Sequence, residues 1–295
     1  VVKRFRDAYV DRYVEGNGGK VILLGDAPIG QYLYVGVQES EGEVISFLDD
    51  DAFVSRKLEY IHRLFSSNPD IGYYHHLAYV IDSRNDVVGR FFGGPRIRVL
   101  IDPRDRRMIK SAVRRFGLIG SLMSVTVVRR EVISPYINKL RSLITGQDTF
   151  MFLSALSSRY LVLHEPLELS FYRVHGDQVS LPRGSSSLDT LLRFSRSAVL
   201  NQHGFYFLNS IFPQLSYVPL RHNLLGAYHY NVLGLIILGL SRRLVASTGF
   251  IVLWRGLFDK SIYRVMAGLL GFAYVILPRR VVQDFLIRYY GARVG

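Results

Sequence analysis

The chain has 295 residues, of which 49% are hydrophobic and 21% charged, a composition that excludes a largely disordered protein and suits one large or two ordinary domains. It contains no cysteine, so disulfides, thiolate metal sites and cysteine nucleophiles are excluded, and any metal must be bound by oxygen or imidazole ligands. The net charge of +13 is uneven, because residues 1–180 carry 24 basic and 21 acidic residues whereas residues 181–295 carry 13 and three. This difference predicts two regions with different partners.

Three segments of the first half show the apolar spacing of amphipathic helices: residues 4–15, 32–41 and 55–65. A glycine-rich run, 16–19, follows the first of them and is typical of a helix C-terminus. The sequence therefore predicts three helices in this half. A Gly- and Arg-rich stretch further along, 89–107, predicts a long loop.

Strand patterns lie between these helices. Short apolar runs predict buried strands at residues 20–24 and 43–48, and β-rich segments follow at 71–81 and 120–128. Alternating strands and helices with short links favour an α/β fold, with a mostly parallel sheet flanked by helices.

The pattern changes after Ser180. A linker-like run at 181–187 is followed by three apolar blocks bordered by Arg and Lys, at 224–240, 244–258 and 265–277, and no strand pattern recurs. We therefore expect a domain over 1–180 and a basic, helical region over 181–295.

This basic region predicts contact with a membrane. Its first apolar block is at the short limit for a spanning helix, and Arg255 and Arg264 interrupt the other two. Such blocks suit helices that lie in the interface of an anionic membrane, so we expect a peripheral protein of the cytoplasmic face or one with short C-terminal membrane helices. The alternative is a helical subdomain packed against the sheet. Nucleic acid is not an expected partner, because no binding motif accompanies the charge.

Three adjacent carboxylates, Asp49, Asp50 and Asp51, directly follow a predicted strand. Adjacent carboxylates repel one another unless a cation neutralises them, and ligands of open α/β sheets bind beyond the carboxyl ends of strands. The cluster therefore predicts a site for Mn²⁺ or Mg²⁺, completed by a diphosphate. The alternative is an acidic turn that begins a helix. Asp26, which follows the strand at 20–24, is a weaker candidate for a nucleotide contact.

Two neighbouring histidines, His75 and His76, suggest a metal site at first sight. Adjacent residues of a strand point to opposite faces, so a joint site is not expected, and we interpret both as strand surface.

Three motifs in order resemble family 2 glycosyltransferases, enzymes of the GT-A fold that use nucleotide sugars. Residues 42–53 resemble the strand that ends in the metal-binding aspartates of this family. Residues 146–152, Gly-Gln-Asp followed by an apolar helix, resemble the segment that supplies the catalytic base. Residues 171–180, with Tyr-Arg-Val-His and a final Ser, are similar to the end of the catalytic domain. The resemblance covers roughly residues 20–180.

The resemblance implies a role for each matching residue. Asp51 would bind the divalent metal, Asp49 would lie near the ribose or the metal, and Asp50 would lie beside the donor diphosphate. Asp148 would be the general base that deprotonates the acceptor hydroxyl, in an inverting displacement. His175 would be a further metal or diphosphate ligand. The acceptor would be a glycan, a lipid-linked molecule or a protein.

The sequence departs from this family near its beginning, where the segment 30–36 also differs from the family's usual small-residue and Arg-Asn pattern. Members begin with two strands that hold the nucleotide base, and neither is present here, so we expect an N-terminally incomplete domain whose nucleotide cannot be assigned. Two alternatives remain open: a catalytically silent binding module, and a metal-dependent nucleotidyl- or phosphotransferase. Without the resemblance, Asp148 would be an ordinary acid in the first turn of a helix, and His175 an ordinary loop histidine.

Overall fold

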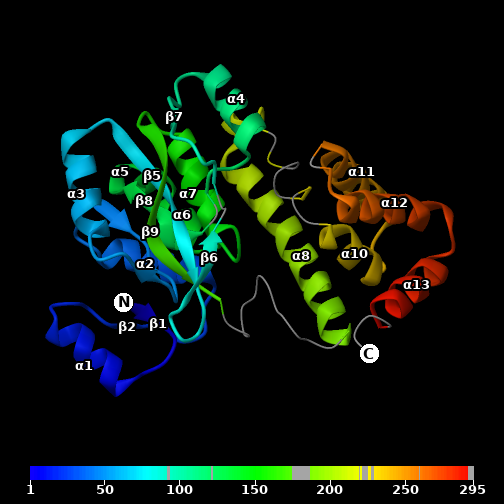
Figure 1. Cartoon of the computed structure of the whole chain (residues 1–295), viewed down its shortest axis with the longest axis horizontal. Helices are drawn as coiled ribbons and strands as arrows, with labels where there is room; N and C mark the ends of the chain where they lie inside the picture. The colour runs from blue at the N-terminus through cyan, green and yellow to red at the C-terminus, as the bar shows by residue number, and fades with distance from the viewer. Residues whose placement is uncertain are drawn as a thin grey trace. The chain divides into compact units, whose positions relative to one another are not determined.

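The structure is a computed structural model that describes residues 1–91, 94–120, 122–174, 187–218, 220, 225–226, 229–258 and 260–291. The chain divides into two compact units (Figure 1). The first, here called the sheet unit, comprises 1–174 and 211–218, and the second, here called the helical unit, comprises 175–210 and 219–295. The domains expected from the sequence meet at residue 180 and do not include the return of 211–218 to the first unit.

The sheet unit is built on a seven-stranded sheet in which β3, β8, β5, β9 and β4 lie side by side in that order, with β6 paired to β5 and β7 to β9. A separate pair of short strands precedes it. The bounds are β1 (Val2–Lys3), β2 (Ile22–Leu23), β3 (Val44–Ser46), β4 (Ala52–Phe53), β5 (Ile71–Ile81), β6 (Val87–Phe91), β7 (Val99–Ile101), β8 (Thr126–Arg129) and β9 (Leu161–Arg173).

The α/β class, with a central sheet flanked by helices and a helical C-terminal region, is confirmed, but the strand directions differ from the expectation. Among the described pairings of the seven-stranded sheet, only that of β5 with β9 is parallel, and the others are antiparallel. The mostly parallel sheet was therefore a wrong prediction. The physical reason is that β5 is buried on both faces. A strand buried on both faces is an apolar run whether it is parallel or antiparallel to its neighbours, so the sequence pattern does not show the direction.

Helices of the sheet unit cover this sheet and include the three that the sequence predicts. They are α1 (Ala8–Gly16), α2 (Ile29–Glu39), α3 (Lys57–Ser67), α4 (Arg106–Phe116), α5 (Arg130–Ile133), α6 (Ile137–Leu140) and α7 (Gln147–Leu156), with short 3₁₀ turns η1 (Met123–Val125), η2 (Ser134–Tyr136) and η3 (Pro213–Leu215). The predicted long loop at 89–107 was wrong, because it contains β7 and the start of α4. A three-residue strand is too short to show a period, and α4 begins after its N-cap Asp105, whose side chain accepts from the N–H groups of Arg107 and Met108.

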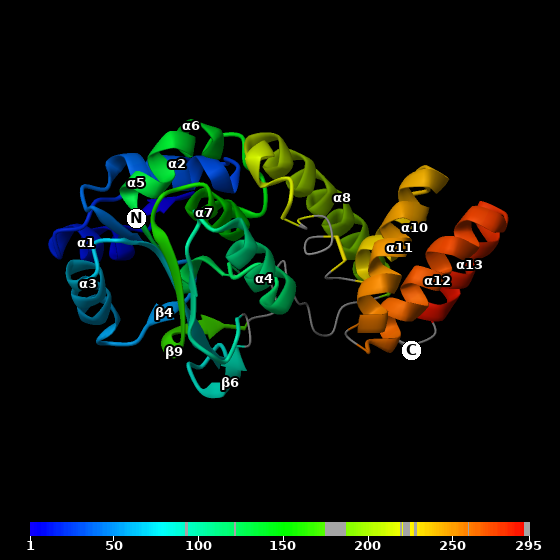
Figure 2. The same ribbon diagram turned by 90° about the horizontal axis from the view of Figure 1, so that it is seen from above.

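Two adjacent tyrosines of β5 connect the sheet to helices on its two faces. Tyr73 packs against Phe152 of α7, with ring centroids 5.7 Å apart. Tyr74 points the other way and lies 6.1 Å from Tyr60 of α3. Because successive strand residues face opposite sides, α7 and α3 cover opposite faces of the sheet (Figure 2). Both tyrosines are fully buried, so each helix is packed closely against its face of the sheet.

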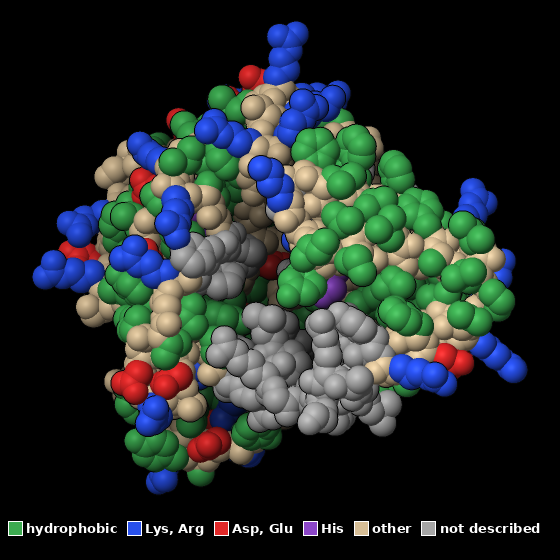
Figure 3. All heavy atoms as spheres, turned by 45° about the vertical axis from the view of Figure 1, so that its right-hand side comes forward, with side chains coloured by type: hydrophobic (Ala, Val, Ile, Leu, Met, Phe, Trp, Pro, Cys, Tyr) green, Lys and Arg blue, Asp and Glu red, His purple; other side chains and the backbone are tan. Residues whose placement is uncertain are grey.

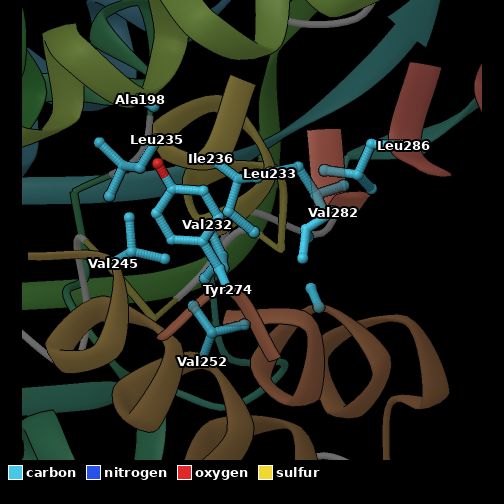
Figure 4. Packing of buried hydrophobic residues seen from close by; sticks show 11 residues of the cluster. Ala198, Val232, Leu233, Leu235, Ile236, Val245, Val252, Tyr274, Val282 and Leu286 are labelled. Carbon is cyan, nitrogen blue, oxygen red and sulfur yellow. The ribbon is translucent and has the colours of Figure 1, made fainter. Parts of the chain in front are cut away.

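The helical unit contains no strand in the part of it that the structure describes. Its helices are α8 (Ser187–Ile211), which ends at the first residue of the segment returned to the sheet unit, α10 (Tyr230–Ile237), α11 (Arg242–Phe258), α12 (Ile262–Ile276) and α13 (Arg279–Gly291). A hydrophobic core forms around the ring of Tyr274, with Val232, Val245 and Val252 nearby (Figure 4). Within the described ranges, we find no helix with the length and apolar character needed to cross a membrane.

Candidate active site

The acidic segment 49–51 links β3 to β4, two strands that lie at opposite ends of the strand order. It therefore runs across the end of the intervening strands. Phe47 N–H approaches the carbonyl of Thr126 on β8 at 3.5 Å, and Ala52 pairs with Phe171 on β9. The three aspartates are held between these two contacts. The segment follows the carboxyl end of β3, where the sequence predicts a ligand site, and lies beside the last residues of β9.

Ser124, in η1, fixes the beginning of the acidic segment. Its Oγ accepts a hydrogen bond from the backbone N–H of Asp49 at 3.0 Å. Its carbonyl accepts from the Lys57 ammonium at 2.8 Å and from the Ser170 hydroxyl at 2.7 Å. Ser124 is fully buried, so these bonds are shielded from water and hold the loop to the sheet.

Arg173, at the end of β9, fixes the other end of the segment. Its backbone N–H donates to Asp51 Oδ1 at 2.9 Å, and its guanidinium donates to the carbonyl of Asp50 at 3.3 Å and to Asn85 Oδ1 at 2.8 Å. The second oxygen of Asp51, Oδ2, is buried without a hydrogen-bond partner in the described part of the chain. Burial raises the pKa of Asp51, against the opposing effects of the Ser124 side chain and the Arg173 backbone.

Asp49 has the most perturbed acid group of the segment. Part of its surface is accessible to solvent, but the surrounding protein restricts its hydration and raises its pKa to about 6. The negative charges of Asp51, Asp50 and Asp148 add to this rise, in that order. A carboxylate that is disfavoured by three like charges is a place where a cation is stabilised.

Asp148 lies in the first turn of α7, as the sequence predicts, and faces the same site. Its Oδ2 accepts a hydrogen bond from the backbone N–H of Leu122 at 3.1 Å, and its Oδ1 accepts from Thr149 N–H at 2.8 Å. Burial raises its pKa, and the backbone hydrogen bonds act against that rise. The segment 122–124 therefore contacts both acidic elements: Leu122 binds Asp148 and Ser124 binds Asp49.

The backbone around this segment is constrained. Leu122 has a positive φ of 125°, a conformation that a branched side chain rarely adopts, and its carbonyl accepts a hydrogen bond from Thr126 Oγ1 at 3.1 Å. Gly120 allows the close approach to α7, since a Cβ there would lie 2.9 Å from Phe152 Cβ. Strain of this kind is frequent at functional sites.

Lys57 is a site residue that sequence reasoning missed. It is fully buried at the start of α3, its ammonium lies 3.5 Å from the centroid of the Phe53 ring, and it donates to Ser124 and Ser170. Burial lowers its pKa to about 7, while the negative charge of Asp51 acts in the opposite direction. Along the sequence Lys57 is six residues from Asp51, but the turn into α3 brings its charge toward the acidic segment.

The chemistry of these side chains fits a hard divalent cation. Within the described ranges, no three His, Asp or Glu side chains are grouped so that they could hold a metal ion by themselves. Mg²⁺ and Mn²⁺, however, commonly use one or two carboxylates and take their other ligands from water and phosphate oxygens. The oxygens that could bind such a cation are the buried Oδ2 of Asp51 and the carboxyl oxygens of Asp49, whose negative charge is disfavoured in the absence of a cation.

The other predicted site residues differ in where they lie. Asp26 is exposed and forms an ion pair with Arg4. His175 lies outside the described residues. Asp50 is exposed, and its carbonyl is the group that contacts Arg173.

The two histidines of β5 are buried, which corrects the interpretation of them as strand surface. His75 and His76 are both fully inaccessible, because helices cover both faces of β5. His75 Nδ1 lies 2.9 Å from Nδ1 of His164 on the parallel neighbour β9, and His76 Nδ1 lies 2.7 Å from the Leu77 carbonyl. The sequence could not show the pairing of His75 with His164, which depends on strand register.

Comparisons with known proteins give matches only among solved structures. No protein-family model matches the sequence. The search of curated proteins also gives no match. The chain is similar to the crystal structure of S. aureus TarS 1–349 in complex with UDP-GlcNAc, with 14% identity and a TM-score of 0.46 over 96% of this chain and 80% of that chain. It is also similar to a crystal structure of S. aureus TarS, with 14% identity and a TM-score of 0.42 over 90% of this chain and 48% of that chain. Similarity at these identities and TM-scores does not assign a function to this chain.

Proposed function

We propose that this protein is a glycosyltransferase of the family 2 type, which transfers a sugar from a nucleotide-sugar donor to an acceptor hydroxyl. One observation carries the proposal: the segment 122–124 holds Asp49 and Asp148 at one site, at the end of the sheet. Asp49 and Asp51 would then bind a cation, and the half-buried carboxylate of Asp148 would act separately; these are the two groups that such a transfer requires.

In this proposal Asp148 is the general base. The acceptor oxygen forms a bond to the anomeric carbon while the bond from that carbon to the diphosphate oxygen breaks, and the nucleoside diphosphate leaves with the electron pair. The acceptor proton goes to Asp148. The raised pKa of this carboxyl makes it a better proton acceptor near neutral pH than an exposed aspartate, and the Leu122 and Thr149 N–H groups fix its orientation. Displacement from the opposite face inverts the anomeric configuration.

Asp51 and Asp49 would hold the divalent cation, Mn²⁺ or Mg²⁺. When bound, the cation would supply charge stabilisation for the diphosphate leaving group. The protein's part is to keep the two carboxylates in place, through the bonds from Ser124 Oγ and the Arg173 backbone. Lys57 would limit the negative charge beside Asp51 before the cation arrives.

The test is to measure donor binding and product release separately. Calorimetry with Mn²⁺ and a panel of nucleotide sugars, including the UDP-GlcNAc named for the TarS structure, is expected to detect binding of at least one donor. Release of the nucleoside diphosphate with glycan, lipid-linked or protein acceptors is expected to require that donor. Binding without release would indicate a silent binding module. Turnover of nucleoside triphosphates, with no use of nucleotide sugars, would indicate a nucleotidyl- or phosphotransferase.

A further inference from the structure

The helical unit has an apolar surface on its outside as well as an apolar core. α11 and α12 form an antiparallel hairpin that packs closely through glycines: a Cβ at Gly268 would lie 2.4 Å from Leu253 Cβ, and one at Gly256 2.7 Å from Arg264 Cβ. The Ser261 N–H donates to the Gly256 carbonyl at 2.9 Å and closes the turn. These contacts lie where the two helices face each other, which we call the inner side. Side chains on the opposite, outer side of each helix do not take part in them.

The outer side is apolar near the turn of this hairpin. We call the exposed side chains there the tip surface; they are Trp254, Leu257, Phe258, Ile262, Tyr263 and Met266. Leu257 is 59% exposed, Phe258 70%, Ile262 64% and Tyr263 65%. The rings of Trp254 and Phe258 contact each other edge to face, with their centroids 5.2 Å apart, which makes the aromatic part of the surface continuous. Figure 3 shows hydrophobic side chains gathered over the helical unit, with Lys and Arg side chains at its margins.

A surface of this kind marks an interaction site. Soluble proteins seldom leave several neighbouring large apolar side chains exposed, and a helix that is apolar on its inner and outer sides has a partner on each. The inner partner is the rest of the helical unit. The outer partner has to be apolar where it meets the tip surface.

The surrounding charge indicates which partner this is. Residues 225–291 contain eight Arg and Lys residues against two aspartates. Lys260, at the turn between the tip side chains, is exposed, and so are Arg242, Arg243, Arg279 and Arg280 at the far end of the hairpin. A second copy of the chain would bring like charges together at this face. An anionic bilayer offers an apolar interior beneath negative headgroups, and Trp and Tyr are favoured at that boundary.

We propose that the tip surface inserts into the headgroup region of an anionic lipid bilayer, with the α11–α12 hairpin lying on the membrane. This proposal is independent of the transferase activity, because it concerns other residues and needs no substrate. Insertion is shallow, since no helix in the described part of the chain can span a bilayer. Apolar burial and attraction of the basic side chains act together.

The single tryptophan of the chain makes the proposal testable in the intact protein, because Trp254 belongs to the tip surface. With vesicles of phosphatidylcholine and phosphatidylglycerol, the Trp254 emission is expected to shift to shorter wavelength. Lipids brominated near the headgroup are expected to quench it more than lipids brominated near the chain ends. Raising the salt concentration is expected to weaken binding without abolishing it, because salt screens the charges and leaves apolar burial intact.

Matched variants separate the tip from other exposed apolar residues. Phe258→Ser and Leu257→Ser are each expected to weaken vesicle binding by about tenfold, as the loss of one buried apolar side chain predicts. Leu58→Ser is the control, since Leu58 lies on α3 and is 58% exposed, nearly as much as Leu257. Lys260→Glu is expected to weaken binding to anionic vesicles more than to neutral ones.

Three results would overturn the proposal. The first is an unchanged Trp254 emission with every vesicle, from a protein whose circular dichroism is helical. The second is self-association in sedimentation experiments that buries Trp254 without lipid, which would assign the tip surface to a second copy. The third is an equal loss of binding in Leu58→Ser and Phe258→Ser, which would show that binding does not depend on the α11–α12 hairpin in particular.

Discussion

The backbone N–H of Asp49 donates a hydrogen bond to Ser124 Oγ at 3.0 Å, across 75 positions of the sequence. Two residues before Ser124, the Leu122 N–H donates to Asp148 Oδ2 at 3.1 Å. One short segment therefore positions both acidic parts of the site. Any change that moves it is expected to affect cation binding and proton transfer together.

Replacing the Ser124 hydroxyl tests this arrangement. Ser124→Ala removes the acceptor for Asp49 N–H in a buried place, and we expect the free energy of unfolding to fall by about 1 kcal/mol. We also expect weaker binding of a nucleoside diphosphate with Mn²⁺, measured by calorimetry, because the acidic segment is less constrained. Ser134→Ala is the control: Ser134 is exposed and its Oγ donates to the Arg130 carbonyl, so binding should not change. Equal binding by both variants would show that Ser124 has no positioning role.

Asp51 is expected to be the residue on which cation-dependent binding depends most. Asp51→Asn keeps an oxygen that can accept from the Arg173 N–H at Oδ1, but it removes the charge beside the buried Oδ2 position. Manganese-dependent binding of a nucleoside diphosphate should be lost in calorimetry, with the fold intact by circular dichroism. Asp70→Asn, at an exposed turn, serves as the matched control. If Asp51→Asn binds as tightly as the control, the metal assignment is wrong.

Much of this site could be predicted because its acidic residues lie in local patterns. Asp49 and Asp51 follow an apolar strand, and Asp148 stands in the first turn of an apolar helix; both patterns are visible in a few residues. These strands and helices depend on residues that are close together in the sequence, so hydrophobic periodicity and capping residues predict them. The roles assigned to these residues remain predictions.

The supporting residues could not be predicted, because they depend on strand pairing and on a turn. Ser124 meets Asp49 only because β3 pairs with β8, and Arg173 meets Asp51 because β9 pairs with β4. Lys57 is near Asp51 because α3 folds back over the sheet. Register between distant strands leaves no trace in a single sequence. The same reason explains why the buried pair of His75 and His164 was missed.

Removal of the proposed base should affect turnover and leave donor binding in place. Asp148→Asn retains an oxygen for the Leu122 N–H but cannot take a proton, so turnover is expected to fall by roughly 100-fold or more. The donor affinity in calorimetry should change little, since this interaction matters mainly in the transition state. Asp51→Asn, measured beside it, should show the opposite pattern, with the loss in donor binding. Turnover within a few-fold of the unchanged protein would assign the base to another carboxylate.

The buried histidines predict that the protein loses stability in acid. Burial lowers the pKa of His76 to about 3, with the Lys57 charge acting in the same direction, whereas an unfolded histidine has a pKa of about 6.5. The unfolded chain then binds one more proton at this residue between these two values. Stability from His76 is therefore fully present above about pH 6.5 and is lost progressively as the pH falls toward 3, by about 1.4 kcal/mol per pH unit.

Denaturant unfolding measured between pH 4 and 7.5 checks this expectation. His76→Gln removes the titrating group, so the free energy of unfolding should fall less steeply with decreasing pH, whatever its value at pH 7.5. His62→Gln is the control, because His62 is exposed on α3. His62→Gln should keep the slope of the unchanged protein. If His76→Gln keeps that slope as well, acid sensitivity arises elsewhere, and His75 and His164, whose pKa values burial also lowers, are the next groups to replace.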